Sequence, residues 1–153
     1  MLILNLIDVV EDVLDSERLS IGEFKMFFET DVPEGFEIRA DPEQMYRVLG
    51  NLIRNARQAI MASGSSGTIC IGAKDGDAAW EISLRDSGPG LPLKAQEHLF
   101  SPFQGSVRKG GSGLGLAISA ELVRGHGGDI RLVRTDQDGT EFLITLPKGD
   151  GTI

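Results

Sequence analysis

The clearest local signal in the chain is the segment DPEQMYRVLGNLIRNARQAIM, residues 41–61. Its apolar residues recur at the spacing of an amphipathic helix and form one continuous stripe. The stripe consists of Met45, Val48, Leu49, Leu52, Ile53, Ala56 and Ile60. Asp41 is a favourable N-cap and Pro42 suits the first helical position. The segment therefore predicts a long helix with one buried face.

Alternating apolar residues on both sides of this helix predict strands, several of them joined by turns rich in glycine and aspartate. The expected strands cover residues 24–28, 36–38, 68–74, 79–85, 129–134 and 140–146. Further helices are expected at residues 4–18, 93–100 and 114–125. Helices that alternate with mostly antiparallel hairpins predict an α+β fold, in the form of a two-layer α/β sandwich.

Composition narrows the class of protein. The chain has 153 residues, of which 41% are hydrophobic and 25% charged, and no run reaches the roughly 20 apolar residues of a membrane-spanning helix. A net charge of -8 argues against nucleic-acid binding. One cysteine, Cys70, suits a reducing compartment and is expected in the core, and no zinc-ligand spacing is present. We expect a cytoplasmic domain without direct membrane contact, although its parent protein can carry an anchor elsewhere.

Two asparagines lie one turn apart on the long helix. Asn51 and Asn55 fall at the margin of its apolar stripe, so both amides can reach a ligand that lies on the helix. One of them can supply the oxygen that a hard cation such as Mg²⁺ prefers. Taken alone, the pair is read more simply as two solvent-facing helix residues.

A glycine-bearing turn, DSGPG at residues 86–90, directly follows an expected strand. Asp86 at the end of that strand can accept a hydrogen bond from the exocyclic amine of adenine. Gly88 and Gly90 allow the backbone to approach a flat ring closely. Because all five residues favour turns, an ordinary turn is the simpler interpretation of this segment alone.

A second glycine-rich segment, GGSGLGL at residues 110–116, leads directly into an expected helix. Exposed N–H groups at a helix N-terminus bind phosphates well. Arg108 and Lys109 precede the segment, and the apolar anchors of FSPF, residues 100–103, come before them. The spacing matches neither the dinucleotide-binding fingerprint nor the P-loop.

In this order and spacing, the clusters resemble the catalytic domain of two-component sensor histidine kinases. That domain belongs to the ATPase superfamily of DNA gyrase and the heat-shock chaperone ATPase. Residues 51–56 look like the N box, 86–90 the G1 box, 100–103 the F box and 110–116 the G2 box. Thr140 matches a further position near the adenine. The wording of residues 55–59, Asn-Ala-Arg-Gln-Ala, is similar to the nitrogen-regulation class, and the resemblance covers about residues 5–147.

The resemblance implies the Bergerat ATP-binding fold, a mixed, mostly antiparallel five-stranded sheet with three helices on one face. It also implies an ATP-binding domain at residues 19–148 and a mobile lid at about residues 101–112. Residues 1–18 would end the linker from a dimerisation hairpin outside the chain, and residues 149–153 would form a tail. The chain alone would be a monomer, because the family dimerises through that hairpin.

The implied activity is binding of Mg-ATP and transfer of its γ-phosphoryl group to a histidine on the separate dimerisation domain. A response-regulator receiver domain then takes the phosphoryl group, and the chain alone is inactive. Asn55 would hold Mg²⁺, Asn51 would orient the incoming histidine, and Asp86 would fix the adenine. The nucleotide-binding residues implied are Asn51, Asn55, Asp86, Gly88, Gly90, Leu91, Phe103, Arg108, Lys109, Gly111, Ser112, Gly113, Leu114, Gly115, Leu116 and Thr140. In place of a lysine that many members carry on the helix, Arg54 or Arg57 could contact phosphates.

The residue at position 51 indicates which branch of the superfamily the chain resembles. Hydrolysing members and anti-sigma-factor kinases carry glutamate there, and an amide cannot act as a general base at neutral pH. Asn51 therefore favours phosphotransfer to a side chain. An anti-sigma-type serine kinase, a hydrolysing ATPase and a non-catalytic nucleotide-binding scaffold are the alternatives. Substantial ATP hydrolysis would support the first two, and ATP binding without phosphotransfer would support the third.

Overall fold

The computed structural model describes residues 2–97, 99–100 and 115–149. Within them, a mixed five-stranded sheet has the strand order β2-β4-β5-β7-β6. The strands are β2 (Met26–Asp31), β4 (Gly67–Asp75), β5 (Ala79–Asp86), β6 (Asp129–Asp136) and β7 (Gly139–Pro147). β2 and β4 are parallel, and the other neighbours in the sheet are antiparallel.

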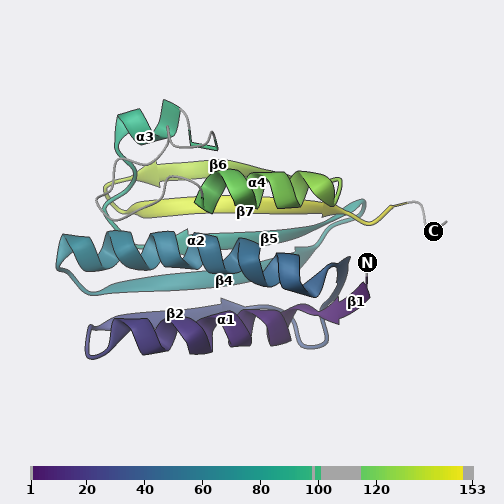
Figure 1. Cartoon of the computed structure of the whole chain (residues 1–153), viewed down its shortest axis with the longest axis horizontal. Helices are drawn as coiled ribbons and strands as arrows, with labels where there is room; N and C mark the ends of the chain where they lie inside the picture. The colour runs from purple at the N-terminus through teal and green to yellow at the C-terminus, as the bar shows by residue number, and fades with distance from the viewer. Residues whose placement is uncertain (1, 98, 101–114, 150–153) are drawn as a thin grey trace.

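One face of the sheet is covered by α1 (Leu6–Ile21), α2 (Pro42–Ser63) and α4 (Gly115–Gly125), with α2 between the other two (Figure 1). A short helix, α3 (Leu93–Glu97), lies in the connection that follows β5. These layers confirm the expected α+β sandwich, with a mixed, mostly antiparallel sheet and helices on one face. No helix in the described part of the chain combines the length and apolar character needed to cross a membrane.

α2 is the central helix of the covering layer, as its sequence predicts. Every residue of its apolar stripe is buried, and the most exposed of them, Ala56, has only 4% of its surface accessible. The Asp41 side chain caps the helix by accepting a hydrogen bond from the Gln44 N–H at 3.0 Å. Gly64 ends it with a left-handed φ of 78°, which glycine adopts without strain. The helix is therefore fixed at both ends and along its buried face.

The strands on either side of the turn at residues 33–35 are present but do not pair with each other. β2 pairs with β4, and β3 (Glu37–Ala40) pairs with β1 (Leu2–Asn5) in a separate two-stranded sheet. Alternation in a sequence shows which face a residue occupies, whereas the partner strand depends on tertiary contacts. The expected helix at residues 4–18 correspondingly starts later, at Leu6, and is preceded by a strand.

α1 packs into the same core as the sheet. Leu6, Val10, Val13 and Leu14 are buried, with at most 1% of each exposed, and the helix packs against α2. The domain boundary expected at residues 18 and 19, and the origin of the preceding segment in a dimerisation hairpin, stay predictions.

Cys70 lies on the sheet face opposite the helices, where it is half-buried. Its neighbours in β4, Ile69 and Ile71, are fully buried, and side chains alternate between faces along a strand. The Arg85 guanidinium approaches the Cys70 Sγ at 3.7 Å from the opposite position on β5. The expectation of a core cysteine was therefore wrong, because the alternation places it on the uncovered face.

His126 joins the end of α4 to the start of α2. Its Nε2 accepts a hydrogen bond from the Asp41 backbone N–H at 3.1 Å, and its Nδ1 lies 2.8 Å from the Leu122 carbonyl oxygen. A neutral imidazole with its hydrogen on Nδ1 satisfies both contacts. The ring therefore has a structural role between two helices that both contribute to the site described below.

We expect His126→Ala to lower the free energy of unfolding by about 1–3 kcal/mol, because it removes two hydrogen bonds that join α4 to α2. Urea denaturation followed by circular dichroism measures the change. Glu121→Ala, at an exposed position of the same helix, is the matched control. An unfolding midpoint equal to that of the control would show that the two bonds contribute nothing.

Candidate functional site

The side of α2 that faces α4 carries the asparagine pair. The Asn51 Nδ2 donates to the Gly115 carbonyl oxygen at 3.1 Å and lies 3.3 Å from the Ser119 Oγ. Asn55, one turn further along the same side, is half-buried like Asn51. The first turn of α4 is thus attached to α2 directly beside the asparagine expected to hold Mg²⁺.

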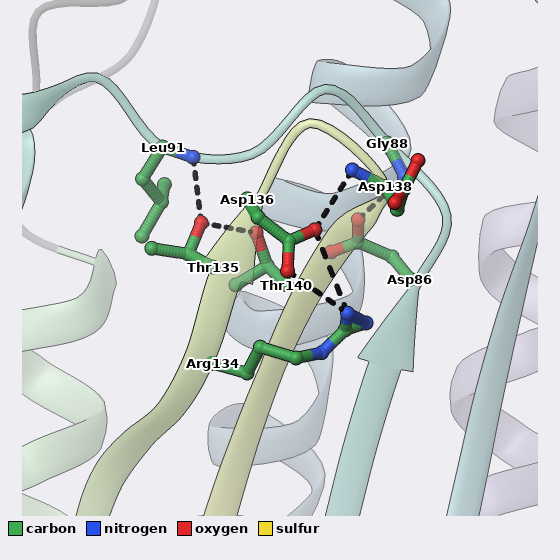
Figure 2. Close-up of polar contacts among 8 residues, drawn as sticks. All are labelled: Asp86, Gly88, Leu91, Arg134, Thr135, Asp136, Asp138 and Thr140. Atoms are coloured by element: carbon green, nitrogen blue, oxygen red, sulfur yellow. Dashed lines mark hydrogen bonds and ion pairs between the residues drawn. The ribbon is translucent and has the colours of Figure 1, made fainter.

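The turn at residues 86–90 reaches the same side of α2 from the sheet. The Asp86 Oδ1, on a residue only 9% exposed, accepts a hydrogen bond from the Gly88 N–H at 2.8 Å (Figure 2). A Cβ at Gly88 would lie 2.9 Å from that Oδ1, 3.4 Å from Ile60 Cγ1 and 3.9 Å from Ala59 Cβ. The turn therefore packs against α2 one turn beyond Asn55.

These contacts bring three separate sequence clusters together along one helix. Asn51 contacts the start of α4, a Cβ at position 88 of the turn would reach van der Waals distance of Ala59 and Ile60 on α2, and Asn55 lies between these two points. The structure therefore juxtaposes a carboxylate at a strand end, an amide on a helix and the N-terminus of a second helix.

The turn between β6 and β7 interlocks with residues 86–90. A Cβ at Gly90 would lie 2.3 Å from the Asp136 carbonyl oxygen, and one at Gly139 would lie 2.0 Å from the Asp86 carbonyl oxygen. Both glycines also have positive φ angles, 87° and 145°. Only glycine fits at either position, so Gly90 has a packing role in addition to the nucleotide contact predicted for it.

Two threonine hydroxyl groups fix Leu91, the residue that follows this turn. The Leu91 N–H donates to the Thr135 Oγ1 at 2.8 Å, and that oxygen lies 2.9 Å from the Thr140 Oγ1 (Figure 2). Thr140 is 4% exposed and lies directly opposite Asp86 in the sheet register. Sequence reasoning found Thr140 but missed Thr135, whose only signal was a polar residue near the end of an expected strand.

Two of the three arginines of α2, Arg54 and Arg57, point away from this site. The Arg57 Nε donates to the buried Glu17 carboxylate at 2.5 Å, and the Arg54 Nε lies 3.9 Å from the other oxygen of that carboxylate. Glu17 belongs to α1, on the opposite side of α2 from α4. The expectation that Arg54 or Arg57 contacts phosphates is therefore wrong in this structure, because both are attracted to a buried carboxylate.

Some of the remaining predicted site residues lie in the described part of the chain, and the others lie outside it. Gly115 and Leu116 begin α4 and are half-buried. Phe100 packs edge-to-face on Phe142 of β7, with ring centroids 6.2 Å apart, which anchors the first residue of the FSPF segment. The predicted residues that lie outside the described residues are Phe103, Arg108, Lys109, Gly111, Ser112, Gly113 and Leu114.

The residues present suit a Mg²⁺ ion that arrives with a nucleotide. In the described ranges, no group of three or more histidine, cysteine, aspartate or glutamate side chains could hold a metal ion. Mg²⁺ usually keeps several waters and binds through one or two protein oxygens together with substrate phosphates. A single amide oxygen from Asn55, beside the N-terminus of α4, fits that kind of site.

The fold and these contacts are those of an ATP-binding module. The family model of histidine kinase-, DNA gyrase B- and HSP90-like ATPases matches residues 40–150, and the chain belongs to this family. Among solved structures, the catalytic domain of the histidine kinase ThkA shares 31% identity with a TM-score of 0.77, over 96% of this chain and 95% of that one. The fold is therefore that of a histidine kinase catalytic domain.

Curated relatives agree with this assignment. Sensor histidine kinase ZraS of Escherichia coli (strain K12) is 38% identical over 111 residues, which are 72% of this chain and 23% of ZraS. The sensory histidine kinase/phosphatase NtrB of Salmonella typhimurium is 38% identical over 120 residues, 72% of this chain and 34% of NtrB. The chain thus spans about a quarter to a third of these relatives, and the similarity to NtrB supports the expected likeness to the nitrogen-regulation class.

Proposed function

We propose that this domain binds Mg-ATP and transfers its γ-phosphoryl group to a histidine on the dimerisation domain of the same kinase. A response-regulator receiver domain then accepts the phosphoryl group. The observation that carries the proposal is the meeting of α2, the turn at residues 86–90 and the start of α4 around Asn55. Relatives that are named sensor histidine kinases support it.

The sheet end of the site suits the adenine base. The Asp86 carboxylate is buried, and one of its oxygens is fixed by the Gly88 N–H. A fixed anionic acceptor at the end of a strand can receive the exocyclic amine of adenine. Gly88 has no side chain of its own to cover this carboxylate, which would let a flat ring approach the backbone there.

The helix end of the site suits the triphosphate. A helix N-terminus carries a partial positive charge and N–H groups without intrahelical partners, which stabilise phosphate oxygens, and α4 begins at Gly115. Asn55 would ligate Mg²⁺ through its amide oxygen, and a bound Mg²⁺ would neutralise phosphate charge during transfer. A histidine nitrogen then attacks the γ-phosphorus in line with the leaving oxygen. A P–N bond forms, the P–O bond to the β-phosphate breaks and ADP leaves.

Asn51 favours transfer to histidine over hydrolysis. Its amide cannot take a proton from water at neutral pH, and its Nδ2 is bonded to the first turn of α4. This contact supports a role for Asn51 in holding α4 against α2, in addition to the proposed orientation of the incoming histidine. Slow ATP hydrolysis by the isolated domain follows from this arrangement.

Two measurements test the proposal. Calorimetric titration of Mg-ATP into the chain is expected to show micromolar binding. The full-length protein that carries this domain is then expected to incorporate γ-phosphate as an acid-labile, alkali-stable adduct, as phosphohistidine is. An absence of ATP binding would overturn the proposal. Rapid phosphate release without labelled protein would identify a hydrolase, and ATP binding with neither product would identify a scaffold.

A further inference from the structure

Three polar side chains form one row across neighbouring strands of the sheet. Asp86 of β5 lies opposite Thr140 of β7, which lies opposite Thr135 of β6. Leu84 and Phe142, two residues away on their strands, are buried beneath the helices, so the row lies on the helix-covered face. Thr135 is thus the far end of a row that begins at the carboxylate proposed to bind adenine.

A β-bulge puts Thr135 in this row. The register shifts between Leu132 and Arg134, and the two consecutive residues Val133 and Arg134 are both exposed. An unbroken register from Leu132 would place Arg134, a long cation, opposite Thr140. By absorbing one residue, the bulge places a short hydroxyl side chain there and directs the arginine outward. Arg134 instead pairs with the exposed carboxylate of Asp136 at 3.2 Å.

The donors and acceptors available in the row indicate the direction in which its hydrogen bonds run. A threonine hydroxyl has one hydrogen to donate and can accept from two donors. The Thr135 Oγ1 already accepts from the Leu91 N–H, and its own hydrogen can bridge the 2.9 Å to the Thr140 Oγ1. The hydrogen of Thr140 is then available to an acceptor on the Asp86 side of the row. Each bond in such a chain polarises the next.

We propose that Thr135 is a positioning residue for the adenine base of the bound nucleotide. It fixes the end of the turn through Leu91 and orients the Thr140 hydroxyl toward the base, although it does not touch the nucleotide itself. The inference rests on the proposed function, because it assigns the base to the Asp86 end of the site. Thr135 would thus act from β6, one of the two edge strands of the sheet.

The test compares the full chain with Thr135→Val, which keeps the shape of the side chain and removes the hydroxyl. The dissociation constant of Mg-ATP, measured by calorimetry well below the unfolding temperature, is expected to rise about 3- to 10-fold, as for the loss of one hydrogen bond. Thr135→Ser restores the hydroxyl and is expected to bind within about twofold of the unchanged chain. Thr135→Ala is a second variant without the hydroxyl, should valine disturb the packing.

Thr145→Val is the matched control, because Thr145 lies on β7 outside the row and only reaches the Asp129 carbonyl oxygen at 3.5 Å. Its ATP affinity is expected to stay unchanged. A Thr135 hydroxyl with a purely structural role would lower the unfolding temperature of the valine variant and leave its ATP affinity intact, which would overturn the inference. A serine variant as weak as the valine variant would also overturn it. Failure of the unchanged chain to bind ATP would instead refute the proposed function, and the inference with it.

Discussion

Replacement of Asp86 by asparagine is expected to weaken ATP binding by about 10- to 150-fold, because a hydrogen bond to an ionised acceptor contributes about 1.5–3 kcal/mol. Asparagine keeps the Oδ1 that accepts from the Gly88 N–H at 2.8 Å, so the turn at residues 86–90 is retained. Its amide NH₂ replaces the other oxygen and faces the amine of adenine, donor against donor. Calorimetric titration with Mg-ATP measures the loss.

A nucleotide whose base has a carbonyl in place of the amine distinguishes a lost contact with the base from a damaged fold in the Asp86→Asn variant. Inosine triphosphate is expected to bind the unchanged chain poorly. The Asp86→Asn variant is expected to bind inosine triphosphate more tightly than it binds ATP, since the new NH₂ can donate to that carbonyl. Asp77→Asn, which changes an exposed carboxylate in the turn between β4 and β5, controls for the loss of one negative charge. Equal ATP affinities of the Asp86→Asn variant and the unchanged chain would show that Asp86 does not bind the adenine.

The fold follows from the sequence wherever a short segment alone determines the outcome. The stripe, cap and first-turn proline of α2 lie within the same 21 residues, and the helix forms where they predict it. The hairpins β4–β5 and β6–β7 also form from adjacent residues. The pairing of β1 with β3 was missed, because it joins residues about 35 positions apart and local alternation carries no information about the partner strand.

The candidate site shows the same division. Asn51, Asn55 and Asp86 were identified because residue type, spacing and place on an element can be read along the chain. Thr135 could not be identified in this way, because its position depends on a bulge and on a backbone N–H from a distant turn. Nor could the ion pair of Arg57 with Glu17, which only the packing of α1 on α2 creates.

Replacement of Asn55 by alanine is expected to reduce histidine phosphorylation by the full-length protein by at least about 100-fold, the scale at which loss of one group stabilising transition-state charge is felt. The reason is its place on α2, between the contact of Asn51 with α4 and the part of the helix, at Ala59, that lies beside Gly88. Alanine removes the proposed Mg²⁺ ligand and leaves the helix intact, since alanine is the strongest helix former. The initial rate of labelling at saturating ATP, over a series of Mg²⁺ concentrations, measures the effect.

The dependence on Mg²⁺ distinguishes a lost ligand from a damaged site. Without Mg²⁺, Asn55→Ala and the unchanged chain are expected to bind ATP within about threefold of each other, because the base contacts at Asp86 are retained. Asn55→Asp supplies a carboxylate oxygen in the same place and is expected to recover part of the rate at high Mg²⁺. Arg47→Ala, at an exposed position of α2, should behave like the unchanged protein. A rate for Asn55→Ala within tenfold of the control at every Mg²⁺ concentration would show that Asn55 is not the ligand of the metal.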